Sequence, residues 1–223
     1  MSLKHIQRYG SYVVLLMLVQ IPVYADIESW KQVGEEDGIA VYLRSIPTEM
    51  ATGAEIKVVG HVNSEPESLL ALIVDYPAAS QWRRGIKKIS RVKTIDENQW
   101  YIHVVTDLPW PIGDRQALAL VTVERDPQTG SILYQFHAVP EVEGVTIEGE
   151  LMQTFGGTYK IVPQADGTVE MTMQNIFEAP FKVPEWVINR LVNSMSIDQV
   201  LSIRRAVQSS KYQVEKQLSL TGT

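Results

Sequence analysis

The sequence predicts an α+β protein built from one antiparallel β-sheet and one long C-terminal α-helix. Several stretches alternate apolar and polar residues with a period of two, which is typical of strands that bury one face. Short polar turns separate these stretches, and a long amphipathic segment follows them. No internal repeat or interdomain linker is visible in the 223 residues, so we expect a single domain.

The strands are predicted most clearly where the alternation is strictest, over residues 54–62, 100–108 and 169–177. Further strands are predicted over residues 39–44, 86–95, 115–124, 132–139 and 151–162. Turn-forming Asp, Pro and Gly residues gather at 126–130 and 164–167. Sequential strands joined by short turns indicate an antiparallel meander.

A short helix is predicted after residue 64. Ser64 and Glu67 have the spacing of a capping box, in which each side chain bonds the backbone of the other residue. The apolar residues Leu69, Leu70, Leu72 and Ile73 follow, and Tyr76-Pro77 ends the helix.

A much longer helix is predicted from about Pro184 onward. Its apolar face is predicted to carry residues at helical spacing, namely Val187, Leu191, Met195, Val200, Ile203 and Val207. Its polar face is predicted to carry Asn189, Arg190, Arg204 and Arg205. A sheet with one long helix is a two-layer α+β arrangement.

The first 25 residues have the three parts of a secretory signal. Lys4 and Arg8 lie in a basic stretch, residues 9–25 carry no charge, and small or apolar residues precede Asp26. Gln20 and Pro22 interrupt the apolar centre, which is shorter than the roughly 20 residues that a membrane-spanning helix needs. We therefore expect residues 1–25 to be a cleaved signal peptide and the protein to be exported, in a bacterial cell to the periplasm.

The mature chain is expected to form one domain over residues 26–215, followed by a C-terminal tail over residues 216–223. Without the signal it has 18 basic and 26 acidic side chains, a formal charge of −8. This charge argues against nucleic acid as a partner and against permanent adsorption to anionic lipids, while brief membrane contact stays open. We expect the domain to be a monomer.

Motifs for catalysis or cofactors are absent from the sequence. It has no G-x-S-x-G elbow, no H-E-x-x-H, no phosphate-binding P-loop and no dinucleotide fingerprint. It has no cysteine, and the remaining histidines His61, His103 and His137 are isolated in separate strand-like stretches. We expect no metal, no cofactor and no catalytic residues, although a Ser/His/Asp arrangement assembled from distant residues stays open.

Apolar residues are abundant, with five tryptophans among them. A well-filled core would account for this composition. A curved sheet that does not close fully on its helix would account for it equally, leaving an apolar cavity of roughly 300 to 1,000 Å³. Composition alone leaves both interpretations open.

Four stretches that follow one another along nearly the whole mature chain carry recognisable motifs. The first is Trp30 with residues 37–44 (DGIAVYLR), and the second runs from Asp75 to Trp82. The third is the proline-containing segment 108–115 (LPWPIGDR), and the fourth comprises residues 156–163 (GGTYKIVP), 177–180 (FEAP) and 183–189 (VPEWVIN). In this order they resemble the START (steroidogenic acute regulatory protein-related lipid transfer) family: its opening, its D…W segment, the loop before its Arg-Asp pair, and its late strands with the start of the last helix.

The resemblance implies a helix-grip fold, in which a curved antiparallel sheet wraps around the C-terminal helix and a lipid or other apolar molecule lies in a tunnel between them. The expected wall of the tunnel combines residues of the predicted strands and helices: Trp82, Trp100, Ile102, Val104, Ala119, Val121, Met171, Met173, Asn175, Val187, Leu191 and Met195. In the steroid-binding members a buried arginine occupies the position that is Val121 here, so the resemblance does not extend to a sterol ligand.

The resemblance also implies a gate and an ion pair. The gate is expected at Trp110, Pro111 and Ile112, where two prolines stiffen the loop around an apolar side chain. This chain has Arg115-Gln116 where the family has Arg-Asp, and a rearranged structural ion pair between Asp114 and Arg115 is expected instead.

The sequence thus favours non-catalytic binding, shielding or transfer of a lipid or other hydrophobic small molecule. Two alternatives stay open. The same cavity could serve a cyclase- or aromatase-like enzyme, for which Tyr101, Tyr134, Tyr159 and Asn175 are the polar candidates. A closed cavity would instead indicate a protein-interaction module.

Overall fold

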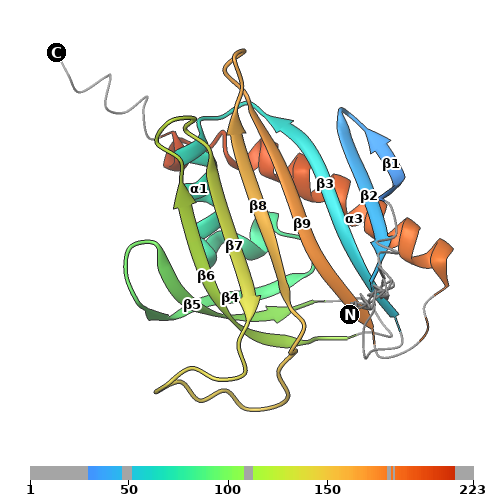
Figure 1. Cartoon of the computed structure of the whole chain (residues 1–223), viewed down its shortest axis with the longest axis vertical. Coiled ribbons are helices and arrows are strands. Elements are labelled where there is room, and N and C mark those ends of the chain that lie inside the picture. Colours follow the sequence, from blue (N-terminus) through green and yellow to red (C-terminus); the bar gives the residue numbers. More distant parts are fainter. Residues whose placement is uncertain (1–29, 47–51, 108–112, 180–181, 183, 214–223) are drawn as a thin grey trace, which may run out of the picture.

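The computed structural model describes residues 30–46, 52–107, 113–179, 182 and 184–213. The signal peptide, the gate residues and the C-terminal tail expected from the sequence lie outside these ranges. Within them, nine strands form one antiparallel sheet in the order β1-β2-β3-β9-β8-β7-β6-β5-β4 (Figure 1). The strands are β1 (Lys31–Glu36), β2 (Ile39–Ser45), β3 (Thr52–Val62), β4 (Ile86–Thr94), β5 (Gln99–Thr106), β6 (Gln116–Arg125), β7 (Ile132–Ala138), β8 (Gly156–Pro163) and β9 (Val169–Ala179).

The helices cover one face of this sheet. They are α1 (Pro66–Val74), α2 (Ala79–Trp82) and α3 (Glu185–Ala206), with short 3-10 turns at Tyr76–Ala78 and Ser210–Tyr212. The long helix α3 lies against β1, β2 and β3, and α1 lies against β7 and β8 on the same side (Figure 1). In Figure 1, β4 and β5 run across the direction of β8 and β9, which shows how far the sheet curls. The predicted α+β layout is confirmed.

Apart from β3 and β4, strands that are neighbours in the sequence pair with each other, and one long-range pairing, between β3 and β9, completes the sheet. Strands β4 to β9 pair in sequence order, as the meander prediction required, and β1 to β3 form a second meander. The two meanders join where β3 pairs with β9 along its whole length, from Thr52↔Ala179 to Val62↔Val169. Burial alternates along β5, where Trp100, Ile102 and Val104 face the core as their period-two pattern predicted.

One strand was missed and one was predicted too long. β1 shows little apolar alternation, but Asp37 and Gly38 both have positive φ and form the two-residue hairpin loop that joins it to β2. The strand predicted over residues 151–162 begins only at Gly156. Its partner β7 ends at Ala138, whose N–H donates to the Phe155 carbonyl. Earlier residues leave β7, and Leu151 forms an isolated bridge with Gln116 at the start of β6.

The capping box predicted for the first helix is not formed. The helix begins one residue later than that motif requires, with Glu65 at the N-cap and Pro66 in the first turn. The Ser64 hydroxyl donates to the Glu65 carbonyl at 3.0 Å. Glu67 accepts a bond from Arg125 at 2.7 Å, and this surface ion pair ties α1 to the end of β6.

The buried face of α3 differs from the predicted one in its first half. The buried residues are Ile188, Val192, Ile197, Val200 and Ile203, whereas Val187, Leu191 and Met195 are only half-buried. Apolar residues stand at both 187 and 188 and at both 191 and 192, so the periodicity alone allows two faces about 100° apart. On the predicted polar face, the Arg204 guanidinium donates to the carbonyls of His61 and Asp37 at 2.8 and 3.0 Å.

Candidate ligand cavity

A cavity of about 700 Å³ lies between the concave face of the sheet and α3. Its volume is in the range of sites that hold small molecules. Apolar and aromatic side chains from strands, helix and loop share the wall, among them Val58, Ile89, Ile102, Val104, Phe136, Leu151, Phe155, Met173 and Met195. The core interpretation and the cavity interpretation of the apolar composition therefore both hold, in different parts of the molecule.

The structure brings together five of the twelve residues expected to form the wall. Ile102, Val104, Met173, Asn175 and Met195 line the cavity. Five others are buried in the surrounding core without reaching the lining, and they are Trp82, Trp100, Ala119, Val121 and Met171. Val187 and Leu191 lie half-buried in the first half of α3, away from the lining, because the helix turns its neighbouring positions inward.

Buried hydrogen bonds support the end of the cavity that Tyr134 lines, which we call the inner end. The Trp100 indole N–H donates to the Tyr76 hydroxyl at 2.7 Å, and the hydroxyls of Tyr76 and Tyr134 lie 3.2 Å apart. The Tyr134 ring packs beside that of Tyr159, with centroids 5.6 Å apart. Burial raises the pKa of Tyr76 and raises that of Tyr134 well above its usual value. Both hydroxyls therefore stay protonated at neutral pH.

Arg83 brings a positive charge to this inner end. It follows α2 directly and lines the cavity, half-buried. Its guanidinium lies 4.8 Å from the ring of Trp82 and 5.5 Å from the ring of Tyr159, both within cation–π range. One of its terminal nitrogens lies 3.5 Å from the Ile73 carbonyl at the end of α1.

The other end of the cavity is more polar. Thr106 and Arg115 lie where β5 ends and β6 begins, and both line it. The Thr106 hydroxyl bonds the backbone of Arg115 twice, as donor to its carbonyl at 3.1 Å and as acceptor from its N–H at 3.0 Å. Glu150 and Glu178 also line the cavity, so acidic as well as basic side chains contribute to its wall.

The expected ion pair between Asp114 and Arg115 is replaced by another pair. The Asp114 carboxylate accepts a bond from the Lys87 ammonium at 2.6 Å, and both side chains are largely exposed. Arg115 is turned toward the cavity instead, because its backbone bonds to Thr106 continue the β5–β6 ladder. The expected gate at Trp110, Pro111 and Ile112 lies outside the described residues.

Several lining residues were not expected from the sequence. Among them are Arg83, Gln199 and the segment of residues 151–155, which was predicted as strand. Gln199 accepts a bond from the Arg84 N–H at 3.0 Å and so joins α3 to the end of α2. A polar residue on the inner half of an otherwise apolar helix face was the only sequence signal for Gln199.

Two features are absent from the described part of the chain. None of its helices has the length and the apolar character needed to cross a membrane. Within the same residues no three His, Cys, Asp or Glu side chains converge in a way that could hold a metal ion.

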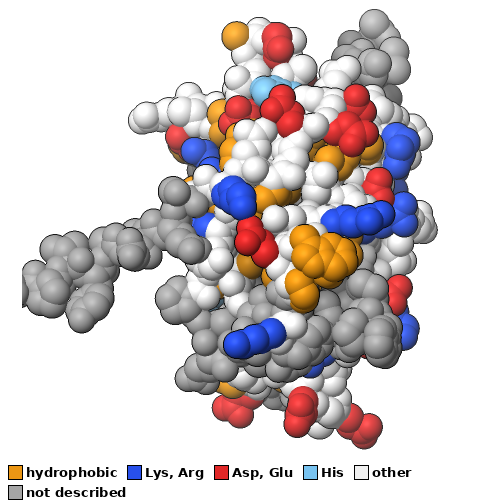
Figure 2. All heavy atoms as spheres, turned by 90° about the vertical axis from the view of Figure 1, so that its right-hand side faces the viewer, with side chains coloured by type: hydrophobic (Ala, Val, Ile, Leu, Met, Phe, Trp, Pro, Cys, Tyr) orange, Lys and Arg blue, Asp and Glu red, His pale blue; other side chains and the backbone are white. Residues whose placement is uncertain are grey.

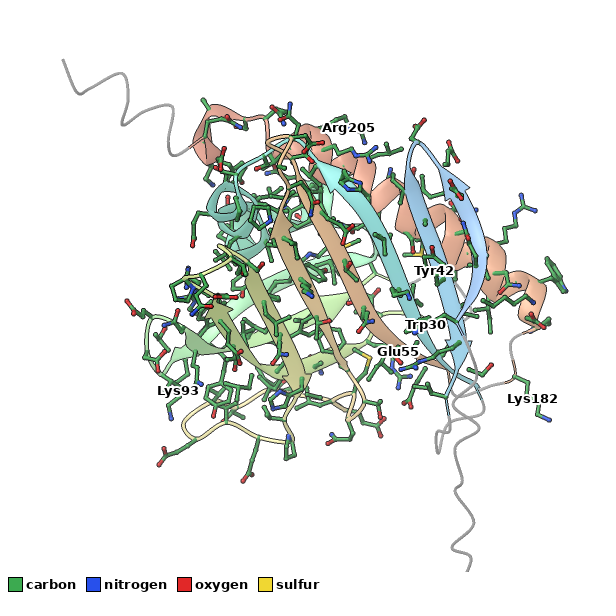
Figure 3. The ribbon with its side chains drawn as sticks, turned by 45° about the horizontal axis from the view of Figure 1, so that its top comes forward. Trp30, Tyr42, Glu55, Lys93, Lys182 and Arg205 are labelled. Carbon is green, nitrogen blue, oxygen red and sulfur yellow. The ribbon has the colours of Figure 1, made fainter. Side chains whose placement is uncertain are left out.

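A cluster of cations and aromatic rings lies on the outer surface of the sheet near its β1 edge. Lys57 lies 4.6 Å from the rings of both Trp30 and Tyr42, and Arg44 lies 4.5 Å from Trp30 while pairing with Glu55. Figure 3 shows Trp30, Tyr42 and Glu55 close together beside β2 and β3. These contacts hold the start of β1 against the sheet.

Comparisons with known proteins agree with this architecture. The family model described as START domain matches residues 22–213. A Pseudomonas aeruginosa protein described as uncharacterized is 25% identical over 188 residues, which cover 81% of this chain and 88% of that protein.

Two solved structures show the same fold. A STAR-related lipid transfer protein from Xanthomonas axonopodis has a TM-score of 0.66 and 21% identity, over 81% of this chain and 99% of that one. Human STARD10 has a TM-score of 0.67 and 14% identity, over 86% of this chain and 78% of that one. The helix-grip arrangement expected from the sequence is thereby confirmed.

Proposed function

Because the chain belongs to the START domain family, we propose that it binds a lipid or another hydrophobic small molecule in the cavity and releases it unchanged. The observation that carries this proposal is the cavity of about 700 Å³ between sheet and α3, walled mainly by apolar side chains. Apolar burial of this kind stabilises a bound molecule by about 25 cal/mol per Å² of apolar surface removed from water. The Xanthomonas axonopodis structure of the same fold is itself described as a lipid transfer protein.

The chemistry of the inner end supports binding rather than catalysis. The hydroxyls of Tyr76 and Tyr134 stay protonated because burial raises the pKa of each. They can therefore donate or accept hydrogen bonds, but they cannot act as bases near neutral pH. We propose that the polar groups of this cavity orient a bound molecule.

The proposal is tested by identifying small molecules that co-purify with the protein under native conditions, using mass spectrometry. Val104→Trp should abolish them, because Val104 is buried, faces the cavity and would fill part of it with an indole. Tyr101→Trp is the matched control on the opposite face of β5 and should retain them. A wild-type protein that carries nothing and also takes up no added lipid would refute the proposal.

We further propose that the protein touches membranes briefly through the start of α3. Figure 2 shows hydrophobic side chains reaching the surface on the side of the molecule where α3 begins, and Trp186 exposes 69% of its area. Tryptophan is favoured at membrane–water interfaces. In a vesicle flotation assay Trp186→Ala should reduce the bound fraction. Ile95→Ala is the control, because Ile95 is also exposed but follows β4, at the edge of the sheet away from the strands that α3 contacts. Equal flotation of wild type and Trp186→Ala would contradict this contact.

The proposed working place is outside the cytoplasm, in the periplasm. The support is the basic, apolar and small-residue order of residues 1–25. N-terminal sequencing of the protein from a cell fraction should read from Asp26. Recovery of an uncleaved chain from the cytoplasm alone would contradict export.

A further inference from the structure

Arg83 is a cavity arginine whose charge has no acidic partner among the residues that the structure describes. Its Nε is sealed from water and makes no hydrogen bond within the described residues. The one bond recorded for its terminal nitrogens, to the Ile73 carbonyl, is long at 3.5 Å. A guanidinium has five N–H donors in a fixed plane, so most of the donor capacity of Arg83 is unused.

Three other arginines among the described residues lie within ion-pair distance of a carboxylate, whereas none of the described carboxylates is that close to Arg91, Arg115, Arg190, Arg204 or Arg205. Arg44 bonds Glu55, Arg84 lies 4.0 Å from Asp198, and Arg125 bonds Glu67. In the described part of the chain no carboxylate lies within ion-pair distance of Arg83. A half-buried charge without a counterion is costly, and an anion that arrives from outside the chain would offset that cost.

Gln199 also lines the cavity and adds a further unused donor. Its Nε2 is buried without an acceptor in the described residues, as is the Trp82 Nε1 in the core behind the lining. The amide orientation of Gln199 is set by its oxygen, which accepts the Arg84 N–H at 3.0 Å, so the NH₂ group is the surplus group. N–H donors that lack an acceptor and lie beside a guanidinium favour a ligand group that only accepts hydrogen bonds.

The acidic lining residues Glu150 and Glu178 form no ion pair with Arg83. The Tyr134 and Tyr159 rings near Arg83 are opposite each other on β7 and β8, and Met173 faces Tyr159 on β9. Glu178 lies five residues beyond Met173 on β9, which is about 16 Å from Met173 at the rise of an extended strand. Glu150 lines the cavity beside Arg115, at that same far end. Apolar wall, including Phe136, lies between the two ends.

The volume limits the size of the ligand. A methylene group takes up about as much space as a water molecule, about 30 Å³, so a chain of 16 to 18 carbons needs about 500 Å³. The cavity of about 700 Å³ holds one such chain with a small polar end group. Two such chains need about 1,000 Å³ before any headgroup is added.

We propose that the cavity takes a single-chain lipid with an anionic end group, a carboxylate or a phosphate, and that Arg83 binds this group at the inner end. The apolar chain then lies along Phe136, Met173 and Val104 toward the end of the cavity that Arg115 lines. This inference rests on the proposed function, because it names the ligand class of the same cavity.

The test uses three ligands with one chain and different end groups. Dodecanoate, dodecyl phosphate and the neutral dodecanol are titrated into the protein by calorimetry. The wild type should bind at least one of the anions about 10- to 100-fold more tightly than dodecanol, the range expected for charge-assisted hydrogen bonds. The tighter of the two anions identifies the end group as a carboxylate or a phosphate.

Arg83→Gln should remove this preference by weakening the anions about 10- to 100-fold, while dodecanol binding stays the same. Unchanged dodecanol binding also shows that the variant is folded with its cavity intact. Arg205→Gln is the charge-matched control, because Arg205 is exposed on α3 and bonds only Ser202 among the described residues (Figure 3). It should keep the wild-type preference.

Two results have different consequences. If the wild type binds dodecanol as tightly as both anions, or if Arg83→Gln weakens all three ligands alike, the role of Arg83 is refuted while lipid binding stands. If the wild type binds none of the three ligands, the proposed function itself fails, and this inference fails with it.

Discussion

Tyr76 connects three elements around the inner end of the cavity, and removing its hydroxyl measures what that connection contributes. In Tyr76→Phe the Trp100 N–H loses its acceptor, and the Tyr134 hydroxyl loses its partner at 3.2 Å. Each buried polar group left without a partner costs about 1–3 kcal/mol, so the loss of two partners should lower the free energy of unfolding by about 2–6 kcal/mol. For a domain of this size that corresponds to a melting temperature lower by about 4–24 °C.

Urea denaturation followed by tryptophan fluorescence measures the effect. Tyr134→Phe is the matched comparison, because it leaves the Trp100–Tyr76 bond in place and should cost about 1 kcal/mol. The decisive result is therefore whether Tyr76→Phe loses more free energy of unfolding than Tyr134→Phe. A loss below about 1 kcal/mol for Tyr76→Phe, or an equal loss for both, would refute the view that Tyr76 is the centre of this network.

Three other predictions concern pH, packing and ligand size. Burial and the neighbouring Asp75 raise the pKa of Tyr212 to about 12 in the folded protein. In the unfolded chain Tyr212 ionises at about pH 10, so the free energy of unfolding should fall as the pH rises above about 10. Tyr212→Phe should reduce this loss, measured as the urea midpoint at each pH. Gly34→Ala should lower the urea midpoint, because its Cβ would lie 1.6 Å from the Asn193 amide oxygen, and Asn193→Ala should restore most of it. Vesicles of dipalmitoyl phosphatidylglycerol should leave no one-to-one complex in native mass spectra, because two such chains exceed the cavity of about 700 Å³. A midpoint independent of alkaline pH, a tolerated Gly34→Ala, or a stable diacyl complex would contradict these expectations in turn.

Much of the fold could be predicted because local pattern and tertiary role coincide. The alternation in β5 is visible in the sequence, since every second residue faces the core. β1 could not be found in this way, because it lies at an edge of the sheet and most of its residues are exposed. Its only signal was the Asp37-Gly38 turn.

The candidate site was less predictable, because its polar residues have no periodic signal. Ile102 and Met173 were found from strand alternation, while Trp100 lies on the same face of β5 as Ile102 and is covered by Tyr76 instead of lining the cavity. Arg83 follows a four-residue helix that no pattern in the sequence predicts. Whether its guanidinium meets a carboxylate depends on distant elements, and such contacts cannot be read from one sequence.

The pairing of β3 with β9 also constrains when the molecule can fold. Residues paired across these two strands are more than one hundred positions apart in the chain, so the central contact of the sheet has a high contact order. Until the last strand is available, β3 keeps an open edge and the two meanders remain separate. A chain with this order of strands cannot complete its sheet until β9 has been synthesised, so the first meander must wait for the second before its edge at β3 is covered.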